Sequence, residues 1–104
     1  MEKRTPHYSL TPVFAVLADP KSTPFTGSAL VGGLELQLSP MQMRKVVGAL
    51  TRKCFYNYKS MTTYADHRVW QDVYIGLTPE GIEVYIKITV YTDERPPVIQ
   101  FKRK

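Results

Sequence analysis

The clearest helical pattern in the chain lies in the stretch SPMQMRKVVGALTRK, residues 39–53. Four apolar side chains recur there at helical spacing and form one stripe: Met43, Val46, Val47 and Leu50. Ser39 is suited to cap the helix, Pro40 to occupy its first position and Gln42 to complete a capping box. We therefore expect a helix that packs its apolar stripe against a sheet.

Two shorter segments precede this helix. In LTPVFAVLADP, Thr11 as N-cap and Pro12 at the first position predict a short helix that stops at Asp19-Pro20. The next segment, KSTPFTGSALVGG, is rich in turn-forming residues. We expect at most one helical turn in it, around residues 28–31, before Gly32-Gly33 breaks it.

After Cys54 the pattern changes to that of β-strands. Four segments predict strands: FYNYKSMTTY (55–64), RVWQDVYI (68–75), VYIKITVY (84–91) and VIQFK (98–102). The third is the strongest, because apolar and polar or aromatic residues alternate along its whole length. TPEG, residues 78–81, predicts a turn between the second and third strands. Helices followed by strands indicate an α+β fold, in which an antiparallel meander is covered on one face by helices. We expect a single domain over residues 1–104.

The alternation predicts a polar sheet face with cationic, phenolic and amide groups. Its candidate residues are Lys59, Tyr85, Lys87, Tyr91, Gln100 and Lys102. Such a face suits a phosphate backbone and stacked bases, but the same residues equally suit the solvated side of a half-exposed sheet. The pattern leaves Gln71 open, because either its own side of the strand or the side of Trp70 and Tyr74 can face the core.

Charge and residue counts narrow the function classes. The net charge of +5 favours an anionic partner such as nucleic acid or an acidic protein. Cys54 is the single cysteine, which excludes an intrachain disulfide and fits a cytoplasmic location. We expect no signal peptide and no membrane anchor. His7, His67 and Cys54 are too few for a zinc site, and Gly32-Gly33 does not make a phosphate-binding loop, so we expect no metal and no cofactor.

One resemblance adds to this picture. The segment YKSMTTYADHRVWQDVY, residues 58–74, resembles the MqsR family of bacterial toxins, as do VYIKITV and the closing FKRK. The similarity is closest over residues 55–104 and implies a RelE-like ribonuclease fold, a curved antiparallel sheet flanked by helices. By this resemblance, Lys59, Gln71, Tyr85 and Lys102 occupy active-site positions. It also implies that Gln71 faces the RNA, whereas Trp70 and Tyr74 turn inward.

The resemblance implies a metal-independent endoribonuclease, an mRNA interferase that serves as the toxin of a type II toxin-antitoxin system. In such a reaction the ribose 2′-hydroxyl attacks the adjacent phosphorus, and a tyrosine or lysine has to move the proton. Tyr85 or Lys59 suits proton transfer, Lys102 suits clamping of the phosphate, and Gln71 suits orientation of the substrate. The expected partners are mRNA and an MqsA-like, zinc-binding antitoxin. A non-catalytic RNA-binding module, or a regulatory module that engages an acidic protein, would use the same surface.

Overall fold

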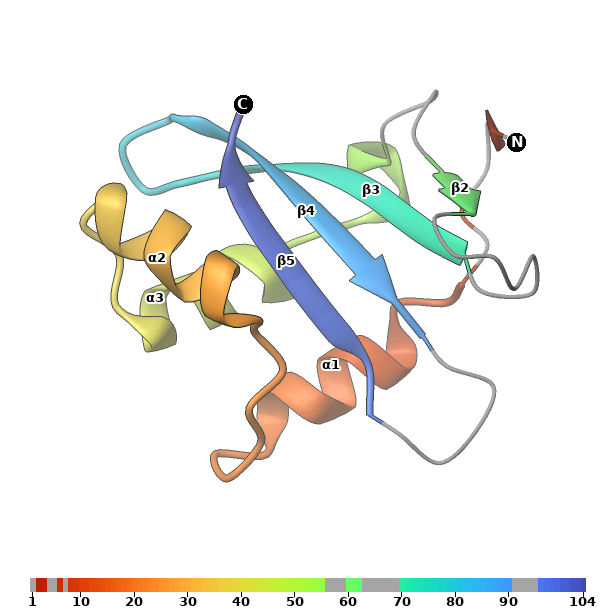
Figure 1. Cartoon of the computed structure of the whole chain (residues 1–104), viewed down its shortest axis with the longest axis horizontal. Coiled ribbons are helices and arrows are strands. Elements are labelled where there is room, and N and C mark those ends of the chain that lie inside the picture. Colours follow the sequence, from red (N-terminus) through yellow and green to blue (C-terminus); the bar gives the residue numbers. More distant parts are fainter. Residues whose placement is uncertain (1, 4–5, 7, 56–59, 63–69, 91–95) are drawn as a thin grey trace.

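The computed structural model describes residues 2–3, 6, 8–55, 60–62, 70–90 and 96–104. Its helices are α1 (Thr11–Ala18), α2 (Gly27–Glu35), α3 (Pro40–Gly48) and the short 3₁₀ helix η1 (Arg52–Cys54). Its strands are β1 (Glu2–Lys3), β2 (Ser60–Thr62), β3 (Trp70–Leu77), β4 (Glu83–Thr89) and β5 (Val98–Arg103). The strands form one antiparallel sheet in the order β1-β2-β3-β4-β5 (Figure 1). The predicted α+β meander is confirmed.

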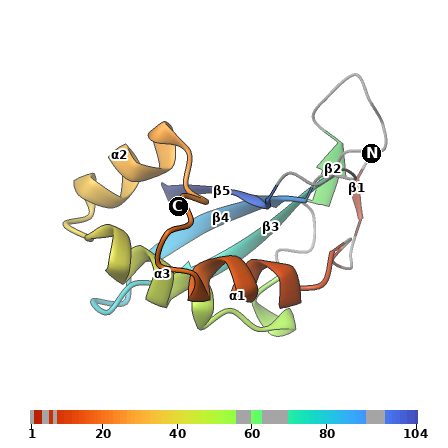
Figure 2. The same cartoon turned by 90° about the horizontal axis from the view of Figure 1, so that it is seen from below.

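Strand β4 divides the sheet into a core face and an open face. Val84, Ile86 and Ile88 are at most 1% exposed and point to the core, whereas the alternate residues of β4 point to the other side. Seen along the sheet, α1 and α3 lie together under the core face, while α2 lies beside β5 (Figure 2). Apolar burial between the sheet and the helices is the main stabilising contribution. Within the described part of the chain, no helix has the length and apolarity to cross a bilayer.

Helix α3 matches its sequence signals closely. The Ser39 hydroxyl accepts a hydrogen bond from the Gln42 N–H at 3.2 Å, and the Gln42 side-chain oxygen accepts one from the Ser39 N–H at 2.8 Å. This capping box satisfies two N–H groups that the helix cannot bond internally. The predicted stripe Met43, Val46, Val47 and Leu50 is buried. The helix nevertheless ends at Gly48, earlier than the sequence pattern suggested, and η1 follows it.

Helix α2 corrects the sequence prediction, because it runs through Gly32-Gly33 instead of breaking there. The Thr26 hydroxyl caps it by accepting the Ala29 N–H at 3.1 Å. A Cβ atom at Gly32 would stand 2.5 Å from the carbonyl oxygen of Phe101 in β5, and one at Gly33 would overlap the Met43 side chain. The two glycines therefore allow close tertiary packing, and this packing outweighs their low helix propensity.

The chain just before α2 covers the outer edge of β5. Ile99 donates its N–H to the Pro24 carbonyl at 2.8 Å, and its own carbonyl accepts the Thr26 N–H at 3.1 Å. Phe25 thereby forms a short parallel bridge with Ile99. Because unpaired strand edges invite pairing with other chains, this contact together with α2 protects that side of the sheet.

The turn between β3 and β4, the start of α1 and the strands β1 and β2 also bear on the sequence predictions. The predicted TPEG turn is present, with Gly81 at a φ of 82° and its N–H bonded to the Thr78 carbonyl at 2.9 Å. Thr11 is the first helical residue of α1 and not its cap, since the cap position falls on Leu10. The two-residue strand β1 was not predicted. Of the predicted strand 55–64, the structure describes Phe55 and residues 60–62.

We predict opposite stability effects for two helical glycines. Gly32→Ala should lower the free energy of unfolding by roughly 1–3 kcal/mol, because the new methyl group forces α2 away from the Phe101 carbonyl. Gly48→Ala meets no atom within 4 Å, so it should be neutral or raise stability by up to about 1 kcal/mol. Urea unfolding of both variants measures the difference. A stabilised Gly32→Ala protein would contradict the close packing of α2.

Candidate active site

The open face of the sheet carries three rows of paired side chains. Residues that are directly opposite in an antiparallel sheet share a face. The register therefore gives the rows Ile75–Tyr85–Lys102, Val73–Lys87–Gln100 and Gln71–Thr89–Val98, running from one end of the face to the other. Polar and cationic groups dominate the first two rows on β4 and β5.

Tyr85 and Lys102 are brought together by this register. They are direct partners on β4 and β5, which puts their Cβ atoms about 4.5–5.5 Å apart. Lys87 is the diagonal neighbour of Lys102, at about 7–8 Å. In the part of the chain that the structure describes, neither lysine forms an ion pair. Two ammonium groups without a carboxylate partner, next to a phenol, form a site that attracts phosphate.

A cavity of about 250 Å³ lies over this cluster, between β4, β5 and α2. Tyr85, Lys87, Gln100 and Lys102 line its sheet side. Tyr85 and Lys87 are half-buried, whereas Lys102 near the chain end is exposed. A ligand in the cavity therefore meets positive charge on the sheet side and the surface of α2 on the other.

Gln71 lies on the same face but at its far end. Its partner Thr89 is four residues from Tyr85 along β4, a distance of about 13–14 Å. Gln71 and Tyr74 are both buried, at 7% and 1% exposure, and alternation along β3 places them on opposite faces, with Tyr74 in the core. That Gln71 faces the RNA stays a prediction. Lys59 and the side chain of Trp70 lie outside the described residues. The structure thus joins Tyr85 to Lys102 and places Gln71 further along the sheet.

The sequence prediction of the site did not include Glu35. This residue lines the cavity from α2, opposite the lysines. The missed signal was the helical spacing of Ser28, Val31 and Glu35, at i, i+3 and i+7, in a segment for which a single turn was expected. Lys87 and Gln100 were candidates for the polar face, and the structure places them beside the Tyr85–Lys102 pair.

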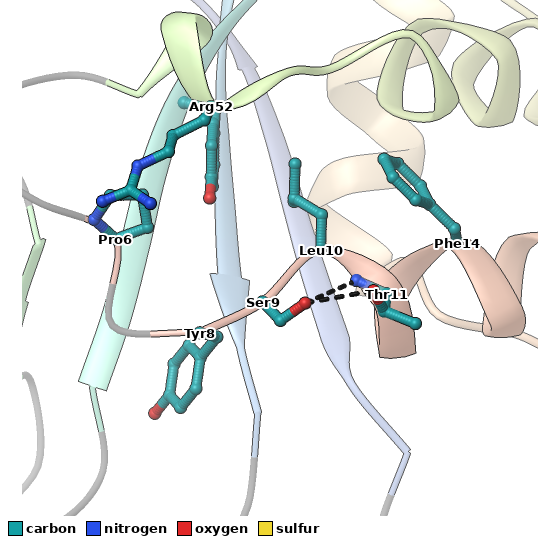
Figure 3. A pocket seen from close by; sticks show the side chains of 8 residues that line it. Pro6, Tyr8, Ser9, Leu10, Thr11, Phe14 and Arg52 are labelled. Atoms are coloured by element: carbon teal, nitrogen blue, oxygen red, sulfur yellow. Dashed lines mark hydrogen bonds between the residues drawn. The ribbon is translucent and has the colours of Figure 1, made fainter.

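A second cavity, of about 420 Å³, lies on the other side of the sheet. It is lined by Pro6, Tyr8, Leu10, Phe14, Arg52 and Tyr74, among others (Figure 3). Burial, together with the nearby Asp72 carboxylate, raises the pKa of Tyr74 to about 12. This phenol is therefore a poor proton donor at neutral pH. Among the described lining residues, Arg52 carries the positive charge. Among the described residues that line this cavity there is no pair of lysines like the one on the open face.

Asp72 shows how the core side of β3 holds the amino-terminal segment. The carboxylate is 1% exposed, and its Oδ2 atom accepts the backbone N–H of Tyr8 at 2.8 Å. A charge-assisted bond of this kind compensates part of the cost of burying the carboxylate. Because Asp72 points away from Gln71 on the same strand, its role is to anchor Tyr8 and not to contact a ligand on the open face.

Possible metal ligands are sparse in the described regions. There, no group of three or more His, Cys, Asp and Glu side chains is close enough to hold a metal ion. Cys54 is half-buried and packs against the core, with its sulfur 3.7 Å from the Thr51 hydroxyl. The described polar residues that line the cavity of the open face carry hydroxyl, amine, phenol, amide and carboxylate groups.

Comparison with known proteins relates the chain to a family. No solved structure matches the chain significantly, so the RelE-like part of the fold prediction stays a prediction. The chain matches the family model described as "Motility quorum-sensing regulator, toxin of MqsA" over residues 5–103. It is also 44% identical, over 104 residues and the full length of both chains, to the mRNA interferase toxin MqsR of Escherichia coli (strain K12). As the resemblance predicted, the chain belongs to the MqsR toxin family.

Proposed function

We propose that this protein is a metal-independent, sequence-selective endoribonuclease that cleaves mRNA as the toxin of a type II toxin-antitoxin system. A single toxin domain, residues 1–104, carries the activity in the cytoplasm. The observation that supports this most directly is the pairing of Tyr85 with Lys102, with Lys87 beside them, on an open sheet face. The 44% identical relative is named an mRNA interferase toxin, which agrees with that chemistry.

The cluster suits phosphoester cleavage by the neighbouring ribose. The 2′-oxygen forms a bond to phosphorus and loses its proton, while the bond from phosphorus to the 5′-oxygen breaks and the leaving oxygen gains a proton. The products are a 2′,3′-cyclic phosphate and a free 5′-hydroxyl. Negative charge grows on the phosphate oxygens during this step, so preorganised ammonium groups lower the barrier.

Individual roles follow from position. Lys102 and Lys87 bind the scissile phosphate from adjacent strands, and Lys102 stabilises its developing charge. Tyr85 or Lys59 transfers protons to and from the reacting oxygens. Gln71 is about 13–14 Å along the strand from Tyr85, so its amide orients a neighbouring part of the RNA and does not touch the same phosphate.

The family is defined as the toxin of MqsA, so the partner of this chain is an MqsA-like antitoxin. The resemblance implies that this antitoxin binds zinc. Any zinc in the complex belongs to the antitoxin, because the toxin has only two histidines and one cysteine in its whole sequence. The net charge of +5 speeds association with an acidic partner. Strand addition at the middle of β5 is blocked, since Pro24 and Thr26 already bond to Ile99 there.

The first functional prediction concerns the substrate and the metal. The purified protein should cleave a naked transcript equally well with and without EDTA, and the new ends should carry cyclic phosphate and 5′-hydroxyl groups. A DNA strand of the same sequence should stay intact, because it lacks the 2′-hydroxyl nucleophile. Sequencing gels measure the cleavage of the RNA, with and without EDTA, and of the DNA strand. Cleavage that stops in chelator and returns with a divalent ion would refute metal independence.

The second functional prediction compares two neighbouring cations of β5. Lys102→Ala should reduce kcat/KM for RNA by about 10²–10³-fold, because it removes a group that stabilises the transition state. Arg103→Ala removes the same charge from the opposite side of β5, where Arg103 pairs with Val84, and should stay within about threefold of wild type. Both side chains are exposed, so thermal unfolding should be nearly unchanged. Equal losses in the two variants would point to general electrostatics and against the site.

The third functional prediction concerns inhibition. The toxin should copurify with the protein encoded next to it, and the complex should cleave the transcript far more slowly than the free toxin. Zinc measured in the complex should remain with the partner after the two chains are separated. A stable complex with full cleavage activity would contradict the toxin-antitoxin assignment.

A further inference from the structure

Helix α2 turns one continuous stripe of its surface toward the cavity. Ser28, Val31, Gly32 and Glu35 recur at i, i+3, i+4 and i+7, and all four line the cavity. The opposite wall consists of Tyr85, Lys87 and Lys102, the residues placed at the phosphate. A nucleotide whose phosphate binds these lysines therefore has α2 within its immediate surroundings.

The chemistry of the α2 wall differs from that of the lysine wall. Ala29 and Val31, together with Phe101 of β5, make it mainly apolar, and Gly32 adds no side chain that would fill the space. An apolar wall accommodates a flat nucleobase and has little attraction for a phosphate. Glu35 lines the same cavity from α2, and its carboxylate repels phosphate and only accepts hydrogen bonds.

The position of Glu35 is electrostatically unfavourable for helix α2. It is the last residue of α2, where the helix dipole disfavours negative charge. In the described part of the chain it forms no ion pair, although Lys87 and Lys102 line the same cavity. A residue that opposes the local electrostatic preference without a compensating contact points to a role in binding.

We infer that α2 forms a base-recognition subsite, in which the Glu35 carboxylate accepts a hydrogen bond from the exocyclic amino group of an RNA base next to the bound phosphate. This inference rests on the proposed ribonuclease function and names the residue that selects the base. Cytosine, adenine and guanine carry such an amino group, whereas uracil presents a carbonyl oxygen that a carboxylate repels. Glu35 is thus a specificity-determining residue, distinct from the groups that move protons.

Binding of two pyrimidine oligonucleotides tests the inference without cleavage. Cytosine has an amino group where uracil has an oxygen. Oligocytidylate and oligouridylate of equal length, both 2′-O-methylated to prevent cleavage, therefore differ mainly in the groups at the hydrogen-bonding edge of the base. Wild-type protein should bind the cytidylate about tenfold more tightly, as one hydrogen bond to a charged group is lost with uracil. In Glu35→Gln the two affinities should differ by no more than about twofold, because an amide both donates and accepts hydrogen bonds and so can bind either base.

A matched variant provides the control. Glu80→Gln removes an exposed carboxylate from the turn between β3 and β4, which does not line the cavity, and should keep the wild-type ratio. Thermal unfolding of Glu35→Gln should be unchanged or occur at slightly higher temperature, because the charge opposing the helix dipole is gone. The loss of preference would then not be a folding defect.

The outcomes separate this inference from the proposed function. A wild-type preference that Glu35→Gln retains, or no wild-type preference at all, would overturn the base subsite even if unmodified RNA is cut. Absence of RNA cleavage with an intact, Glu35-dependent preference would overturn the ribonuclease proposal alone. A uniform loss of cleavage at all sites in Glu35→Gln, with the binding ratio kept, would assign Glu35 to proton transfer and reject base recognition.

Discussion

The alternation of side chains along β4 is the constraint on which the other features depend. This strand has neighbours on both sides, so its residues must satisfy a core face and an open face at the same time. Val84, Ile86 and Ile88 complete the core, which commits Tyr85 and Lys87 to the open face. A shift by one residue would bury a lysine and expose isoleucines, so burial of the core also determines the position of the site.

The packing of α2 on β5 connects the fold with the site. Gly32 allows the helix to approach the Phe101 carbonyl, and the Pro24–Thr26 segment bonds to the edge of the same strand. The helix thereby protects the sheet edge and also supplies the second wall of the cavity. One element thus serves stability and binding, and movement of α2 away from β5 would affect both.

The open face carries an electrostatic cost that the core has to offset. Lys87 and Lys102 are diagonal neighbours of equal charge, and Glu35 stands at the negative end of a helix dipole. These arrangements weaken the folded state by small amounts, whereas the burial of β4, β5 and α3 contributes much larger stabilisation. The capping box of α3 and the partly buried bond between Asp72 and the Tyr8 N–H add local contributions. A bound phosphate would relieve the repulsion between the lysines.

Sequence alone determined the features that depend on residues close to one another along the chain. The capping box of Ser39 and Gln42, the turn that ends at Gly81 and the two faces of β4 follow from short-range hydrogen bonds and from the period of the strand. The candidates Tyr85 and Lys102 also came from this alternation and from the family resemblance. Their direct pairing required the register between β4 and β5.

Only the tertiary structure decided the remaining features, because they depend on contacts between distant segments. The orientation of Gln71 was ambiguous until Tyr74 was seen packed against Phe55 in the core. The continuation of α2 through Gly32-Gly33 opposes local propensity and is explained by contact with Phe101 and Met43. The same packing brings Glu35 to the cavity of Tyr85 and Lys102. Local sequence patterns contain no information about which strand a glycine-containing helix will approach.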